Sequence, residues 1–192
     1  MISTGARMKM SAFLVVGALV LAPACGGGGG DAATGGSPTT LSASFMADQF
    51  TPGAGNVSMA QGNRAGDSVT VKVNLTDTSL VFGVAFDVVY DETKATYMGY
   101  TAGQALESGN AAPNYTVEGG AQAGRLVVGV SRPGSSGTTT VSGTKTVINL
   151  TFRVKALGSF PVSFENAIVT DGQSVPQPLP GISWFAGALQ GD

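Results

Sequence analysis

Hydrophobic and polar residues alternate most regularly between Gly66 and Asp91. The first half of this stretch places one set of residues on an inner side (Val69, Val71, Val73, Leu75) and another on an outer side (Thr70, Lys72, Asn74, Thr76). The second half does the same, with Val84, Phe86, Val88 and Tyr90 inward and Gly83, Ala85, Asp87 and Val89 outward. A period of two is typical of a strand with one buried face. The stretch therefore predicts two consecutive strands.

Shorter alternating segments continue through the rest of the chain, separated by turns rich in Gly, Pro, Asn and Asp. They predict an apolar patch at Phe45 and Met46 and strands at 57–61, 95–100, 115–118, 125–131, 146–154, 160–164, 167–169 and 184–189. Polar loops are expected at 107–113 and 134–143. About nine short strands without an amphipathic helix favour an antiparallel two-sheet β-sandwich of jelly-roll type.

Composition agrees with an all-β fold. The 192 residues include 29 glycines, only 11% are charged, and Val and Thr recur in the second half. This length supports one domain whose core needs no disulfide or metal, and no cofactor is predicted. The net charge of −2, with no Lys/Arg cluster, gives no electrostatic footprint for nucleic acid or an anionic membrane.

The first 24 residues are predicted to be a signal peptide. Arg7 and Lys9 precede a short apolar run from Ser11 to Ala22. A run this short behind a basic start indicates an export signal, because about 20 apolar residues are needed to span a bilayer. The protein is therefore expected to be exported.

The sole cysteine, Cys25, directly follows this signal. The sequence from Leu21 to Cys25 resembles a bacterial lipobox, in which the cysteine is lipidated, although Pro23 departs from the pattern. The implied product is an outer-membrane or cell-surface lipoprotein held by a lipid anchor only. Ordinary cleavage after Ala24 is the alternative and would leave a soluble periplasmic or secreted protein. Residues 25–40, rich in Gly, Ser and Thr, are expected to form a tether, and 41–192 the folded domain.

Four segments within 41–192 resemble the cohesin domain, a β-sandwich module that docks dockerin-bearing partners. These segments are Gly66 to Val73, Gly83 to Asp91, Leu150 to Lys155 and Phe164 to Asp171. The resemblance spans roughly residues 57 to 189 and implies a protein-binding function. Carbohydrate-binding modules of the same superfamily share the architecture.

The resemblance also implies a binding face. In cohesins, outward residues of the strand that corresponds here to 81–90, with its neighbours, receive the dockerin helices. The implied partner-binding residues are Gly83, Ala85, Asp87, Val89, Arg125 and Val127. Type I members often carry Asn or Asp where this chain has Gly83 and Ala85, so the usual polar contacts are missing. A flat face of small residues would suit a partner helix that packs across it. The alternative interpretation is that these positions are only the solvent-facing side of a sheet.

Other side chains offer weaker candidates. Trp184, the sole tryptophan, could stack on a sugar ring, although core packing is the commoner role. Carboxylates at predicted turns could bind Ca²⁺, but hydrogen bonds to the turn backbone explain them better (Asp67, Asp77, Asp91, Glu92, Asp171). No metal site is therefore assigned.

Catalysis is not expected. The chain has no histidine, which excludes Ser-His and Cys-His pairs, and no feature selects two carboxylates for glycoside hydrolysis. The sequence predicts a non-catalytic, membrane-tethered module that binds a protein, with a dockerin as candidate partner, linked to polysaccharide breakdown or cell-surface assembly. A carbohydrate-binding module that holds polysaccharide at the cell surface is the first alternative, and a structural envelope lipoprotein the second.

Overall fold

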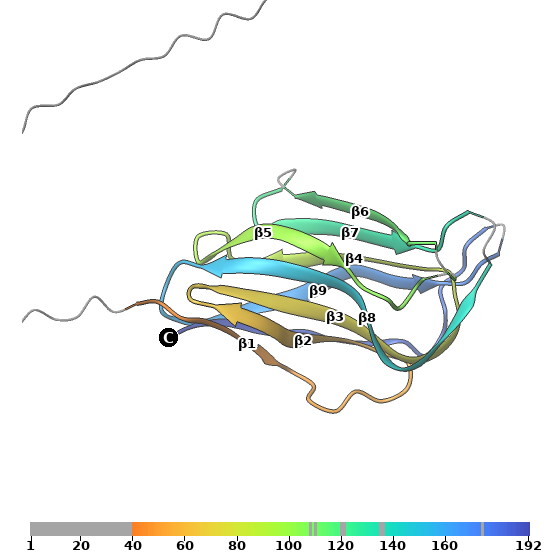
Figure 1. Cartoon of the computed structure of the whole chain (residues 1–192), viewed down its shortest axis with the longest axis horizontal. Helices are drawn as coiled ribbons and strands as arrows, with labels where there is room; N and C mark the ends of the chain where they lie inside the picture. The colour runs from red at the N-terminus through yellow and green to blue at the C-terminus, as the bar shows by residue number, and fades with distance from the viewer. Residues whose placement is uncertain (1–39, 108, 110, 120–121, 135–136, 174) are drawn as a thin grey trace, which may run out of the picture. The chain divides into compact units, whose positions relative to one another are not determined.

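The computed structural model describes residues 40–107, 109, 111–119, 122–134, 137–173 and 175–192. In these residues eleven strands form two sheets that pack face to face (Figure 1). The expected all-β sandwich is therefore confirmed. Within the described ranges there is no helix that is long and apolar enough to cross a membrane. The predicted signal peptide, Cys25 and the tether up to residue 39 lie outside these ranges.

One sheet has six strands, and every neighbouring pair in it is antiparallel. Its order is β1 (Ala43–Ala47), β11 (Gly187–Gly191), β9 (Gly158–Thr170), β4 (Gly83–Tyr90), β7 (Arg125–Ser131) and β6 (Asn114–Gly119). The most regular part of the sequence thus supplies a central strand, β4, with neighbours on both sides.

The other sheet has five strands in the order β10 (Ser183–Phe185), β2 (Asn56–Ala65), β3 (Ser68–Val81), β8 (Thr139–Val154) and β5 (Ala95–Ala102). Its pairs are antiparallel except that β10 runs parallel to β2. The predicted antiparallel sandwich thus holds, with this parallel edge pair as an exception.

Several boundaries differ from the predicted ones; the strands expected over 160–164 and 167–169 are one continuous strand, β9. The single strand expected over 184–189 is divided at Ala186 into β10 and β11, which belong to different sheets. Gly187 permits this change of sheet, because a Cβ at this position would lie only 2.2 Å from the Met46 carbonyl oxygen. The loop expected over 134–143 is shorter, since β8 already begins at Thr139 and pairs with the end of β3.

The inward residues predicted for β3 and β4 form the core as expected, with Tyr90 only half-buried at the end of β4. On the outer side of β3, Lys72 is exposed, but Asn74 and Thr76 are buried. Their side chains hydrogen-bond to Thr146 and Thr144 of β8, at 2.9 Å each, which covers them.

Three of the four tyrosines come from edge strands, Tyr97 and Tyr100 from β5 and Tyr115 from β6, and Tyr90 ends β4. Tyr90 and Tyr97 pack edge-on against Phe152, with ring centroids 5.2 and 5.9 Å away. Tyr100 packs against Tyr115, whose hydroxyl donates to the Gly103 carbonyl at 3.0 Å. Burial raises the pKa of Tyr90, Tyr97 and Tyr115 above the ordinary tyrosine value. These rings thus pack near β5 and β6, which are edge strands of the two sheets in the described residues.

Candidate partner-binding face

The six residues predicted for partner binding lie side by side on the outer surface of the six-stranded sheet. The register pairs Asp87 with Val127 and Val89 with Arg125, and it places Gly129 opposite Ala85. We call these positions the β4–β7 face: Gly83, Ala85, Asp87, Val89, Arg125, Val127 and Gly129. The sequence therefore selected one contiguous surface.

Exposure varies along this face. Val127 is 42% exposed, and Ala85, Val89 and Arg125 are partly exposed. Gly83 and Asp87 are buried, although both were expected to face solvent. Asp87 is only 8% exposed because neighbouring side chains from β7 and β9 lie over it. Asp87 therefore belongs to the face and also links β4 to β7 and β9 through its hydrogen bonds.

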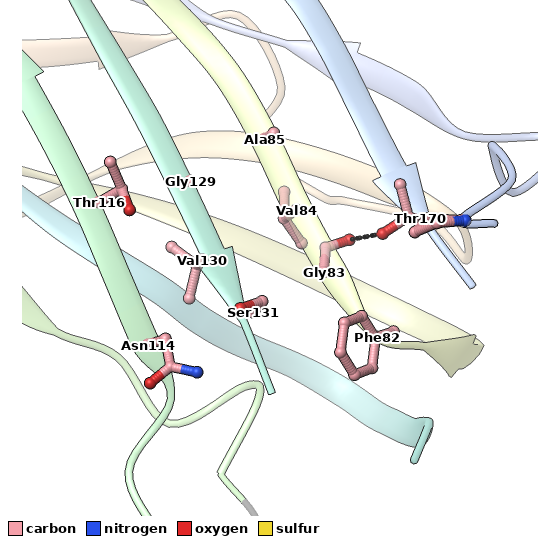
Figure 2. Close-up of a pocket in the computed structure, with 11 residues that line it drawn as sticks. Phe82, Gly83, Val84, Ala85, Asn114, Thr116, Gly129, Val130, Ser131 and Thr170 are labelled. Atoms are coloured by element: carbon pink, nitrogen blue, oxygen red, sulfur yellow. Dashed lines mark hydrogen bonds between the residues drawn. The ribbon is translucent and has the colours of Figure 1, made fainter. Parts of the chain in front are cut away.

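A groove of about 290 Å³ lies at the Gly83 end of the face, and its lining is mostly apolar. Its lining includes Thr116 from β6, Gly129 from β7, Ala85 from β4 and Thr170 from β9, which are labelled in Figure 2. Among the described residues, a Cβ at Gly129 would have only the Thr116 side chain within 4 Å, at 3.8 Å, so the missing side chain leaves the space between Thr116 and Ala85 open. The groove is thus a consequence of small residues in adjacent central strands.

A charged cluster occupies the other end of the face. Arg125 donates through Nη1 to Asp87 Oδ2 and through Nη2 to Glu165 Oε2. Asn166 Nδ2 also donates to Asp87 Oδ2, at 2.7 Å. Hydrogen bonds to Glu165 and Asp87 raise the pKa of the Arg125 guanidinium above its ordinary value. The guanidinium is therefore fixed in position by this chain before any partner arrives.

Sequence patterning missed Glu165 and Asn166. The β4–β9 register shifts between Ala85 and Asp87, and this bulge leaves Asn166 in the left-handed region with φ 47°. Asparagine tolerates that conformation better than most residues. The bulge turns Asn166 toward Asp87, and alternation alone gives no sign of it.

Trp184 lies against the core. Its ring contacts Phe164 and Phe86, with centroids 5.0 and 5.9 Å away, and it is only partly exposed. This is the packing role that was expected to be commoner than sugar stacking.

Two of the five turn carboxylates, Asp91 and Asp171, bond to the backbone of their own turn, as expected. Asp91 accepts from the Thr93 hydroxyl at 2.6 Å and from its amide at 2.8 Å, and these bonds lower the pKa of Asp91. Asp171 accepts hydrogen bonds from two backbone amides. Asp77 accepts one from the Gly143 amide. Asp67 accepts one from the Ser68 hydroxyl and forms an ion pair with Arg153. Glu92 contributes its carbonyl, which accepts from Lys155. Across the part of the chain described above, no three His, Cys, Asp or Glu side chains gather as a metal site would require.

These features define a two-sheet β-sandwich whose outer sheet face carries an apolar groove among small residues at one end and a charged cluster at the other. The family model for the cohesin domain matches residues 55–177, which is more than half of the chain. This protein therefore belongs to the cohesin family. No curated protein matches the chain.

Solved cohesin structures share the fold. The sixth cohesin of scaffoldin B from Acetivibrio cellulolyticus, solved with a mutant Cel5 dockerin, is 23% identical, with a TM-score of 0.51 over 74% of this chain and 96% of that one. A type II cohesin from the same organism is 16% identical, with a TM-score of 0.53 over 79% and 95%. The seventh ScaB type I cohesin from Pseudobacteroides cellulosolvens is 17% identical, with a TM-score of 0.51 over 69% and 88%.

Proposed function

We propose that this protein is a non-catalytic docking module whose β4–β7 face binds a helical protein partner of the dockerin type. The observation that carries the proposal is the cross-strand pair of Ala85 and Gly129 beside Gly83 at the centre of the sheet. Small residues at these positions let a helix approach the sheet closely along the face. Membership of the cohesin family, and the dockerin bound to the scaffoldin B cohesin, support this choice of partner.

The face also offers an anchor for an apolar side chain. The groove of about 290 Å³ is lined mainly by apolar atoms, and Val127 stands exposed beside Ala85 and Gly129. Interfaces commonly gain most of their affinity from a few apolar or aromatic side chains that fill such depressions. We therefore expect the partner to insert an aliphatic or aromatic residue next to Gly129.

Charge on the face favours a basic partner surface. Asp87 lies on the face, and two further carboxylates lie beside it, Glu165 on β9 and Glu118 on β6, whereas Arg125 supplies one guanidinium. Arg125 pairs with both Asp87 and Glu165 and so balances only one of these two charges, while the Glu165 side chain is still 48% exposed and Glu118 is also exposed. Lysine or arginine on the partner would meet these two carboxylates. Such charge pairing affects the orientation of the partner and the rate of association more than the affinity.

The predicted lipid at Cys25 would hold this module at a membrane, with residues 26–40 as a spacer. The chain would then collect its partner at the outer membrane or cell surface, where docking could serve polysaccharide breakdown or surface assembly. The support for this location is the apolar run before Cys25 and the Gly-rich segment after it.

The experiment compares two matched substitutions. Ala85→Arg places a long charged side chain in the middle of the β4–β7 face. Ala60→Arg makes the same change at a partly exposed position of β2, on the outer side of the other sheet opposite Lys72. Both proteins and the wild type are titrated calorimetrically with a panel of dockerin modules that includes the Cel5 dockerin.

We expect at least one dockerin to bind wild type with a Kd in the micromolar range or below. Ala85→Arg should weaken that binding by at least about 100-fold without lowering the melting temperature, because interface cores tolerate inserted charge poorly. Ala60→Arg should leave it unchanged. Equal binding by wild type and Ala85→Arg would move the site elsewhere, and no binding by any dockerin would contradict the partner class.

A further inference from the structure

A second pocket, of about 400 Å³, lies on the five-stranded sheet, away from the β4–β7 face. Two lysines line it, Lys72 from β3 and Lys145 from β8, together with the polar side chains of Thr144, Thr146, Asn149 and Gln104. None of the described residues that line it carries a carboxylate. The lysines are 73 positions apart in the chain, so only folding brings them to one pocket.

The two ammonium groups are available to a ligand. Both lysines are exposed, and neither forms an ion pair with any residue that the structure describes. Arg153, another basic residue of β8, instead forms an ion pair with Asp67 at 3.4 Å. Lys72, opposite Asn149, lies on the outer face of the sheet, whereas Lys145 is opposite the buried Leu75, so the two lysines approach the polar depression from opposite faces of the sheet.

The polar side chains around these lysines are held in place. The hydroxyls of Thr144 and Thr76 lie 2.9 Å apart, and Thr146 donates to Asn74 at 2.9 Å. Asn149, the cross-strand neighbour of Lys72, donates to the Ala102 carbonyl at 3.2 Å, which leaves its amide oxygen free to accept. A site assembled before binding loses less freedom when a ligand arrives.

The backbone beside the pocket is equally constrained. The Ala105 amide donates to the Thr146 carbonyl at 2.9 Å, which draws the segment after β5 against β8. Gly103 makes this approach possible, because a Cβ there would lie 2.1 Å from the Thr146 carbonyl oxygen. Gln104 is thereby fixed at the pocket wall.

Taken with its size, this lining indicates the class of ligand. The volume is within the range of about 300–1,000 Å³ that is typical of small-molecule sites and is far larger than the roughly 30 Å³ that one water occupies. The hydroxyl and amide groups suit a ligand rich in hydroxyls, and the lysines suit an oxyanion. The mainly polar lining offers no place for an acyl chain.

We propose that the Lys72–Lys145 pocket binds an acidic saccharide unit, in which a carboxylate meets the two ammonium groups and the sugar hydroxyls meet Thr144, Thr146, Asn149 and Gln104. The site is independent of partner docking, because its lysines belong to β3 and β8 of the other sheet. It would let the module contact an anionic polysaccharide while the β4–β7 face holds a protein.

Calorimetric titration of the full-length protein tests the proposal. The probes are digalacturonate and dimannuronate, with galactobiose as the uncharged match for the first. The variants are Lys72→Gln and Lys145→Gln, and Lys94→Gln removes the same charge outside the pocket. Inorganic phosphate and phosphatidylglycerol vesicles are run beside them to separate a sugar site from a simple oxyanion or headgroup site.

We expect one acidic disaccharide to bind saturably, and galactobiose at least about tenfold more weakly. Each pocket variant should lose about tenfold in affinity, as removal of a charge-assisted hydrogen bond implies, and Lys94→Gln should lose none. Binding should also weaken as salt is raised, because exposed charges are screened. Melting followed by Trp184 fluorescence verifies that every variant is folded.

Three results would overturn the proposal. The first is no binding of either acidic disaccharide, and the second is equal binding by wild type and both pocket variants. The third is binding of inorganic phosphate or phosphatidylglycerol vesicles as tight as that of the disaccharides, which would assign the lysines to an oxyanion or a lipid headgroup.

Discussion

Replacement of Phe86 by alanine tests how the two sheets are joined. Phe86 is 1% exposed, and its ring contacts Phe164 at 5.2 Å and Trp184 at 5.9 Å. These three rings come from β4, β9 and β10, so they link the six-stranded sheet to an edge strand of the other sheet. Removing the central ring therefore opens a cavity between the layers.

The expected loss in the free energy of unfolding follows from these contacts. A buried Phe→Ala change costs about 3–5 kcal/mol, and each lost aromatic pair adds about 0.5–1.5 kcal/mol beyond area burial. With two pairs lost, we expect the upper part of the first range, about 4–5 kcal/mol. For a domain of this size, that corresponds to a fall in melting temperature of roughly 8–20 °C.

Urea unfolding followed by Trp184 fluorescence measures the change, since the sole tryptophan contacts the mutated side chain. Phe50→Ala is the matched control. Phe50 is 81% exposed, so its loss should alter the free energy of unfolding by less than about 0.5 kcal/mol. A loss below about 1 kcal/mol for Phe86→Ala would refute the assignment of this ring to the junction of the two sheets.

Two further outcomes are expected. Cys25→Ala should abolish acyl labelling and move the protein from the membrane to a soluble fraction; membrane retention with unchanged labelling would contradict the lipid anchor. The raised pKa values of Tyr90, Tyr97 and Tyr115 imply stability that is complete below the ordinary tyrosine pKa of about 10 and is lost as pH rises through the folded values. Urea unfolding between about pH 8 and pH 11.5 should show this decline, and a flat profile would show that the tyrosines ionise equally in both states.

The sequence predicted the strands well because alternation reports burial directly. Val69, Val71, Val73 and Leu75 are all buried on β3, and Val84, Phe86 and Val88 on β4. The alignment of β7 beside β4 also matched the cohesin resemblance, so that Arg125 and Val127 fell on the predicted face. Local periodicity and a known family order were sufficient for these features.

The remaining features depend on departures from regular pairing. The β9 bulge brings Asn166 to Asp87, and the crossing at Ala186 sends Trp184 and Leu189 into different sheets. The Lys72–Lys145 pocket depends on the β3–β8 register, which shifts between Val73 and Asn74. A pattern with a period of two contains no information about such shifts, so neither site could be completed from the sequence.

Methyl cross-saturation in a complex with a bound dockerin most directly tests the claim that the partner docks on the β4–β7 face. Saturation of the dockerin protons should transfer to the methyl groups of Val127, Val89 and Ile168, which lie on this face or beside it. The methyl group of Met98, which is exposed on β5 of the other sheet, should keep its intensity. Transfer to Met98 with unaffected Val127 and Val89 would contradict the account.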